Sequence, residues 1–93
     1  MNEINIGEVY YIIAKGRSLG QAEEFLRRLE SLPIQRLGNT FEEVLDAAKL
    51  KAQFPISYAD AFGIATAQRS QAVMVTGDPE FQTVSHLIEI MWL

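Results

Sequence analysis

Three acidic residues stand in segments whose other residues are mostly apolar. Glu8 lies among isoleucine, valine and tyrosine residues, Asp60 lies among alanines, and Asp78 follows a Val-Met-Val run. An unpaired charge in a buried segment costs roughly several kcal/mol, so a buried acid needs a cation nearby. Carboxylate oxygens are the ligands that Mg²⁺ and Mn²⁺ prefer. If the fold brings the three acids together, we expect an acidic pocket that holds one of these two ions.

Hydrolysis of a phosphodiester is the reaction that suits such a pocket. The ion would polarise a phosphoryl oxygen and lower the pKa of an attacking water, so no side chain needs to act as a covalent nucleophile. Thr76 precedes Asp78 by two positions, and its hydroxyl could orient a carboxylate or that water. A threonine at the end of a strand is also a good strand former, which is the simpler explanation for it.

Helix capping is an alternative explanation for each acid. Two of them have the spacing of a capping box behind a residue that can start a helix: Asn5 with Glu8, and Ser57 with Asp60. Asp78 before Pro79 is a good N-cap. Thr40 with Glu43 has the same spacing, but Glu43 lies outside the apolar stripe that begins at Phe41, whereas Glu8 and Asp60 share faces with isoleucines. Both explanations stay open, because an acid can cap its own helix and also bind metal.

The composition is that of a small soluble globular protein. At 93 residues, with 48% hydrophobic and 22% charged residues, the chain should form one domain with a modest core that buries about 60–65% of the unfolded surface. No apolar run approaches the roughly 18 residues that a membrane helix needs, and no signal peptide is recognisable. We therefore expect a cytoplasmic protein with no membrane contact. Because there is no cysteine, disulfides and thiolate metal sites are excluded.

The charge distribution argues against a broad nucleic-acid-binding surface. The net charge is −4, and the eight Lys and Arg residues form no run longer than two, so any contact with nucleic acid must be local. We expect the aromatic residues Tyr10, Tyr11 and Trp92 in the core rather than on the surface as platforms for bases. His86 has no partner in the sequence and is expected to be an ordinary surface or strand-edge residue.

Helices and strands should alternate along the chain. The patterns predict helices over about 6–15, with Asn5 as N-cap and burial on all sides, and then after Ser18, Thr40 and Ser57. Strands are expected over 33–37, 72–76 and 86–93, with a short helical turn after Asp78. Alternation of this kind predicts an α/β fold with a parallel sheet, of about three strands and four to five helices.

Three segments carry the acids: Ile4-Asn5-Ile6-Gly7-Glu8-Val9-Tyr10-Tyr11-Ile12, Ile56-Ser57-Tyr58-Ala59-Asp60-Ala61 and Val75-Thr76-Gly77-Asp78-Pro79-Glu80-Phe81. In this order and spacing they resemble the PIN-domain family, especially its VapC-type toxin ribonucleases. The resemblance implies a three-layer α/β fold and a metal-dependent endoribonuclease that uses Mg²⁺ or Mn²⁺. It matches Glu8, Asp60 and Asp78 to the second, third and fourth acidic metal ligands, and Thr76 to the hydroxyl residue at the strand end.

The chain departs from the family pattern at its N-terminus. By resemblance, members begin with a strand that carries an aspartate followed by Ser or Thr, and their sheet has the order 3-2-1-4-5. Against that pattern we expect residues 1–93 to be a single truncated PIN-like domain, which keeps the equivalents of strands three, four and five. The first aspartate would be missing, and the apolar strand over 73–76 would have an open edge.

Two functions follow from these expectations. The first is a PIN-family endoribonuclease of the toxin type, or a truncated remnant of one, and whether the chain is an active enzyme stays open because the first acidic ligand is absent. The alternative is a non-catalytic module, without a complete metal site, that dimerises or binds a small antitoxin protein. We expect a homodimer, in which a second copy covers the open strand edge. A third reading, a small α/β ligand-binding domain whose acids are only caps, is the least favoured.

Overall fold

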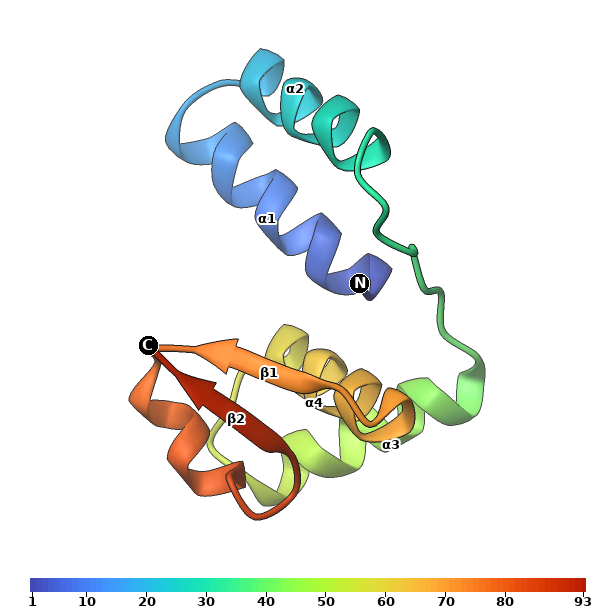
Figure 1. Cartoon of the computed structure of the whole chain (residues 1–93), viewed down its shortest axis with the longest axis vertical. Helices are drawn as coiled ribbons and strands as arrows, with labels where there is room; N and C mark the ends of the chain where they lie inside the picture. Colours follow the sequence, from blue (N-terminus) through green and yellow to red (C-terminus); the bar gives the residue numbers. More distant parts are fainter. The chain divides into compact units, whose positions relative to one another are not determined.

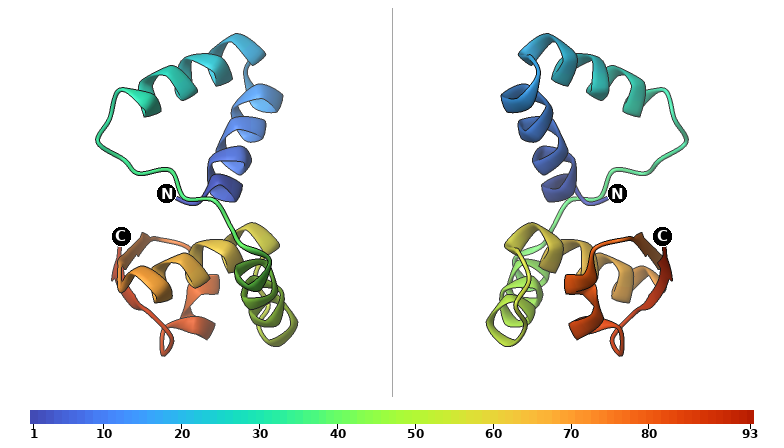
Figure 2. Two further views of the ribbon diagram at one scale, coloured as in Figure 1. Left: turned by 90° about the vertical axis from the view of Figure 1, so that its right-hand side faces the viewer. Right: turned by 90° about the vertical axis from the view of Figure 1, so that its left-hand side faces the viewer.

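The computed structural model describes all of residues 1–93, which divide into two compact units, residues 1–38 and residues 39–93. Figure 1 and Figure 2 show the helices of the first unit in blue to green and the second unit in green to red.

The first unit is a hairpin of two helices, α1 (Glu3–Gly16) and α2 (Leu19–Glu30), which pack against each other (Figure 2). The Ser18 hydroxyl caps α2 as expected, by accepting a hydrogen bond from the Gln21 amide at 3.0 Å. The Tyr10 hydroxyl donates a hydrogen bond of 2.7 Å to the Glu23 carboxylate and so ties the two helices together. This bond to a carboxylate raises the pKa of Tyr10, because the charged phenolate would face a negative group.

The start of α1 differs from the prediction. Asn2, not Asn5, is the N-cap, and its buried side chain accepts a hydrogen bond from the Ile4 amide at 2.9 Å. Both asparagines precede an apolar helical pattern, so the sequence alone does not separate them. The expectation that this helix is buried on all sides is wrong, since Ile6 is its one buried residue and Tyr11 is 57% exposed.

The strand expected over residues 33–37 does not form. Leu37 makes a single parallel bridge with Asn2, through bonds from the Glu3 amide to the Leu37 carbonyl at 2.8 Å and from the Leu37 amide to the Met1 carbonyl at 2.9 Å. A ladder cannot grow from this bridge, because the partner segment enters α1 at Glu3 and its amides and carbonyls turn to the helix. The sheet therefore has two strands instead of about three.

The second unit contains the main core and both strands. Helices α3 (Phe41–Gln53) and α4 (Tyr58–Ser70) pack against each other. The Thr40 and Ser57 hydroxyls cap them, as predicted, by accepting bonds from amides three residues on, at 3.2 and 3.1 Å. The buried side of α3 is centred on Ala47, and Phe41, at the head of the expected apolar stripe, is 75% exposed. The fully packed core comprises Ala47, Ile56, Ala61, Phe62, Ile64, Phe81 and Val84.

A left-handed residue turns the chain back from α4 into the sheet. Gln71 has φ = 50°, and the amides of Gln71 and Ala72 bond back to carbonyls in the last turn of α4. Strand β1 (Val73–Thr76) follows, then the 3₁₀ helix η1 (Pro79–Val84), then β2 (Glu89–Trp92). The two strands pair in parallel, with Thr76 opposite Trp92. The predicted α/β fold with a parallel sheet is confirmed, with four α-helices and one 3₁₀ helix.

Candidate metal centre

Asp60 is placed by the N-cap of α4. The Ser57 hydroxyl accepts a hydrogen bond from the Asp60 amide at 3.1 Å, which fixes this residue in the first helical turn. Its neighbour Ala61 is fully buried, whereas Asp60 itself is half-buried at the edge of the core, so the prediction that it lies on the buried side holds only in part. The return bond of a capping box, from the Ser57 amide to the Asp60 carboxylate, is not formed, and the carboxylate stays available to a ligand.

Asp78 is placed by the turn that follows β1. The Thr76 hydroxyl accepts a hydrogen bond from the Asp78 amide at 3.1 Å, and the Asp78 carboxylate accepts one from the Glu80 amide at 2.9 Å. Asp78 is thus the N-cap of η1, with Pro79 in the first turn, as predicted. Thr76 orients the backbone of Asp78 rather than a carboxylate directly, and in this way it fixes where that side chain begins.

The fold brings these two acids together with a third. Strand β1 runs back along α4, so the carboxyl end of β1 lies near the amino end of α4 (Figure 1). Oxygen atoms of Asp60, Asp78 and Glu80, one from each carboxylate, all lie within 4.8 Å of one another. Asp60 is half-buried and the other two acids are exposed. The carboxyl end of a parallel sheet is where α/β proteins commonly bind ligands.

No basic side chain neutralises this cluster. The ion pairs of the protein are all formed by other acids: Arg27 and Arg28 with Glu24, Arg36 with Glu3, and Arg69 with Glu43. Like charges about 4 Å apart repel by about 1 kcal/mol per pair in water, and by more where solvent is excluded. The amino end of α4 offsets part of this repulsion, because its amides carry partial positive charge. A hard divalent cation with oxygen ligands, Mg²⁺ or Mn²⁺, fits this donor set.

Glu80 belongs to the acidic cluster but was not among the site residues predicted from the sequence. It is the second residue of η1, and its amide is held by the Asp78 carboxylate. The sequence did indicate that Glu80 lies near Asp78, because an acid two positions after an acidic N-cap is close to it in a tight helical turn. The sequence could not show that this turn faces Asp60, because that depends on the return of β1 along α4.

Glu8 lies in the other unit, near the middle of α1, and is half-buried. The acidic cluster is made by residues of the second unit alone. Because Asn2 rather than Asn5 caps α1, Glu8 is not the acid of a capping box, and that explanation for it is wrong. Its role as a metal ligand stays a prediction.

Glu43, the acid that shares the capping-box spacing but lies outside the apolar stripe, pairs with Arg69 of α4 at 3.0 Å, and both side chains are partly buried. Where an acid in this unit serves the packing of two helices, it has a basic partner, and the three clustered acids have none.

Aromatic residues are more exposed than expected. Tyr11 is 57% exposed and Trp92 is 41% exposed, so their placement in the core was wrong. Each lies on a small element with one covered face, where a large side chain on the rim stays open to solvent. His86 is exposed and its ring packs beside that of Phe54 at 5.8 Å between centroids, which agrees with an ordinary surface histidine.

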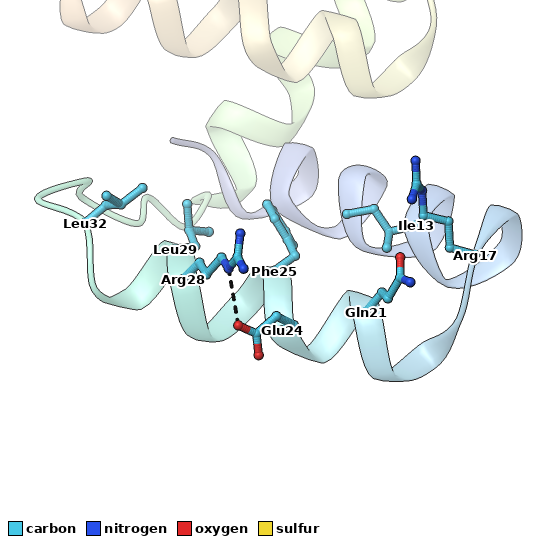
Figure 3. Close-up of a pocket in the computed structure, with 8 residues that line it drawn as sticks. All are labelled: Ile13, Arg17, Gln21, Glu24, Phe25, Arg28, Leu29 and Leu32. Carbon is cyan, nitrogen blue, oxygen red and sulfur yellow. Dashed lines mark hydrogen bonds and ion pairs between the residues drawn. The ribbon is translucent and has the colours of Figure 1, made fainter.

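A groove runs along the helical hairpin of the first unit (Figure 3). It has a volume of about 450 Å³ and is lined by Ile13, Arg17, Gln21, Glu24, Phe25, Arg28, Leu29 and Leu32. Apolar side chains form most of its surface, and Arg28 pairs with Glu24 at 3.2 Å on its wall (Figure 3). Arg27 and Arg28 together lower the pKa of the Glu24 carboxyl, so this acid is charged at neutral pH.

None of the helices is both long enough and apolar enough to span a membrane. No curated protein and no solved structure matches the chain. A family model described as PIN domain matches residues 1–87. PIN domains are generally nucleases and typically bind a divalent metal, and the α/β fold with a short parallel sheet is consistent with an incomplete PIN-like fold. The match over nearly the whole sequence, together with the acidic cluster at the end of β1, shows that this chain belongs to the PIN-domain family.

Proposed function

We propose that this protein is an Mg²⁺- or Mn²⁺-dependent endoribonuclease of the toxin type, which hydrolyses phosphodiester bonds of RNA. One observation carries the proposal: three carboxylates without basic partners lie within 4.8 Å of one another, at the carboxyl end of a parallel strand, in a chain of the PIN family. We also propose a cytoplasmic location, where RNA substrates are present.

Each residue of the cluster has a defined part in this proposal. The carboxylates of Asp60, Asp78 and Glu80 hold the cation, and Thr76 fixes the backbone of Asp78. Glu8 is proposed as a further acidic ligand, as the family resemblance implies. When bound, Mg²⁺ or Mn²⁺ supplies a Lewis acid for the phosphoryl oxygen and lowers the pKa of an attacking water. The three clustered carboxylates then also repel the phosphate unless the cation is present, so activity should depend strictly on metal.

RNA cleavage by site variants tests the proposal. We expect the purified chain to cleave a labelled single-stranded RNA in Mg²⁺ or Mn²⁺, to lose this activity in EDTA, and to lose it in Asp60→Asn and in Asp78→Asn. Asp46→Asn is the matched control, because Asp46 is an exposed aspartate of α3 outside the cluster. Activity that is equal in the wild type and in both site variants would come from a contaminating nuclease, and the proposed function would then be wrong.

The groove along the helical hairpin favours a second candidate function. A non-catalytic module that binds a small antitoxin-like protein would use this groove, whose apolar lining and volume of about 450 Å³ suit an inserted helix or extended segment. The two functions can be separated by Mn²⁺ binding. A chain that binds no Mn²⁺ yet binds such a protein with loss of affinity in Phe25→Ala would be a binding module rather than an enzyme.

A further inference from the structure

Trp92 lies at the same end of the two-stranded sheet as the turn that holds Asp78. It is the last residue of β2 and lies directly opposite Thr76 in the parallel pairing. Residues paired across neighbouring strands project from the same face of the sheet. The Thr76 hydroxyl holds the Asp78 amide at 3.1 Å, and the Thr76 carbonyl accepts a bond from the Leu93 amide at 3.0 Å. The indole therefore projects from the end of the sheet that fixes Asp78.

Trp92 is more exposed than the residue pair that precedes it on the same face of the sheet. Met74 and Ile90, the preceding residue pair on the same face, pack against the core, whereas Trp92 extends beyond it and is 41% exposed. Its indole N–H makes no hydrogen bond to the protein. Tryptophan has the largest apolar surface of any side chain, so leaving it open at the rim of a site sacrifices much of the stabilisation that burial would give.

The negative charge of the chain limits how it can bind a nucleic acid. The chain has a net charge of −4, and three acids form the site itself, so phosphate contacts contribute little to holding a nucleic-acid strand. Stacking of a base on an aromatic ring needs no positive charge and is tolerant of sequence, and one such contact strengthens binding by roughly ten-fold or more. Stacking on Trp92 would therefore provide binding free energy that this acidic chain gains little of from phosphate contacts.

We propose that Trp92 stacks on a nucleobase of single-stranded RNA whose backbone lies at the acidic cluster. The inference rests on the proposed function, because it takes RNA as the ligand of that cluster. It adds a base-binding subsite at the end of β2 and predicts little sequence preference at that position, since every base offers a flat face to the indole.

Intrinsic fluorescence measures this contact directly, because Trp92 is the single tryptophan of the chain. The full chain is titrated with a short single-stranded oligoribonucleotide in Ca²⁺, a hard cation with oxygen ligands that offsets the charge of the carboxylates while the Mg²⁺ and Mn²⁺ proposed for cleavage are left out. Binding is followed in parallel by anisotropy of a labelled strand, whose length is checked by gel after the titration. We expect the bases to quench the Trp92 emission as binding saturates. An abasic ribose-phosphate oligomer of the same length should quench it little. Equal quenching by the abasic oligomer, or saturated binding without quenching, would overturn the proposal.

Variants separate stacking from a structural role and from catalysis. We expect Trp92→Ala to weaken RNA binding by about ten-fold and to raise KM while kcat stays within about two-fold, and Trp92→Phe, which keeps a ring, to recover most of the loss. Tyr11→Ala, at an exposed aromatic of α1, is the matched control and should change neither quantity. Unchanged RNA affinity in a folded Trp92→Ala, or a fall in kcat alone, would contradict stacking.

The same measurements distinguish this proposal from the proposed function. If the wild type binds RNA with base-dependent quenching but cleaves nothing in Mg²⁺ or Mn²⁺, the stacking site stands and the enzymatic activity fails. If it cleaves RNA in a metal-dependent manner and the Trp92 emission is insensitive to bound bases, the activity stands and the stacking site fails.

Discussion

The backbone of each acid in the cluster is anchored by a local hydrogen bond from its amide. Asp60 is fixed through its amide by the Ser57 hydroxyl, and Asp78 through its amide by the Thr76 hydroxyl. Glu80 is fixed through its amide by the carboxylate of Asp78. In each case the backbone is anchored, and at least one carboxylate oxygen stays available to join the cluster. Ordinary caps and turns are thus enough to bring three candidate metal ligands together, which is why capping and metal binding were both reasonable explanations of the same residues.

The charge of Glu80 should contribute to Mn²⁺ affinity. Glu80→Gln removes one of three charges from the cluster while the backbone bond to Asp78 is kept, so we expect Mn²⁺ affinity to fall by about ten-fold. Calorimetry with Mn²⁺ measures this change. Glu89→Gln, at an exposed glutamate at the far end of β2, is the control and should bind as the wild type does. Equal affinity in Glu80→Gln and wild type would remove Glu80 from the site.

Thr76 should act through Asp78. Thr76→Val keeps the shape of the side chain but removes the acceptor for the Asp78 amide, which we expect to lower the free energy of unfolding by about 0.5–1.5 kcal/mol and to weaken Mn²⁺ binding. Thr76→Ser, which keeps the acceptor, should retain most of the affinity. Urea unfolding and Mn²⁺ calorimetry on the two variants measure these effects, and identical metal affinity in the valine variant would show that the turn does not depend on this bond.

Elements with a local signal were predictable, and elements defined by distant partners were not. Helices α2, α3 and α4 begin where the hydroxyls of Ser18, Thr40 and Ser57 cap them, because a cap is a contact between residues three positions apart. The strand expected over 33–37 fails for the opposite reason, since a strand needs a partner and its one partner segment is committed to α1. Of the acidic cluster, Asp60 and Asp78 were expected from local pattern, whereas the approach of Glu80 to Asp60 depends on the path of β1.

The turn between α4 and β1 determines whether Asp78 can approach Asp60, because it directs β1 back along α4. Gln71 takes a left-handed conformation there, at φ = 50°, which is unfavourable for a residue with a Cβ. We expect Gln71→Gly to raise the free energy of unfolding by about 0.5–1 kcal/mol without changing Mn²⁺ affinity. Chemical denaturation measures the first quantity and calorimetry the second. A destabilised glycine variant would mean that the Gln71 side chain itself stabilises the turn.

The two-stranded sheet leaves apolar residues of the second unit open to solvent. It has two strands, so β1 and β2 each have an edge without a strand partner, and Val73 and Val75 on β1 are 45% and 57% exposed. An apolar strand with an open edge pairs readily with another chain. We therefore propose that two copies associate through β1.

Oligomeric state tests this association. We expect light scattering to give the mass of a dimer for the wild type, and that of a monomer for Val75→Lys, because a charge on the strand would have to be desolvated in the interface. Ile12→Lys, at an exposed apolar residue of α1, is the control and should remain dimeric. A monodisperse wild-type monomer would contradict the proposed homodimer.

Titration calorimetry with Mn²⁺ shows directly whether the acids at the end of β1 form a divalent-metal site. We expect one saturable site in the wild type, lost in Asp60→Asn and in Asp78→Asn and unchanged in Asp46→Asn, with all four proteins folded by circular dichroism. Absence of Mn²⁺ binding in the folded wild type, or binding of equal strength in both site variants, would contradict the metal site.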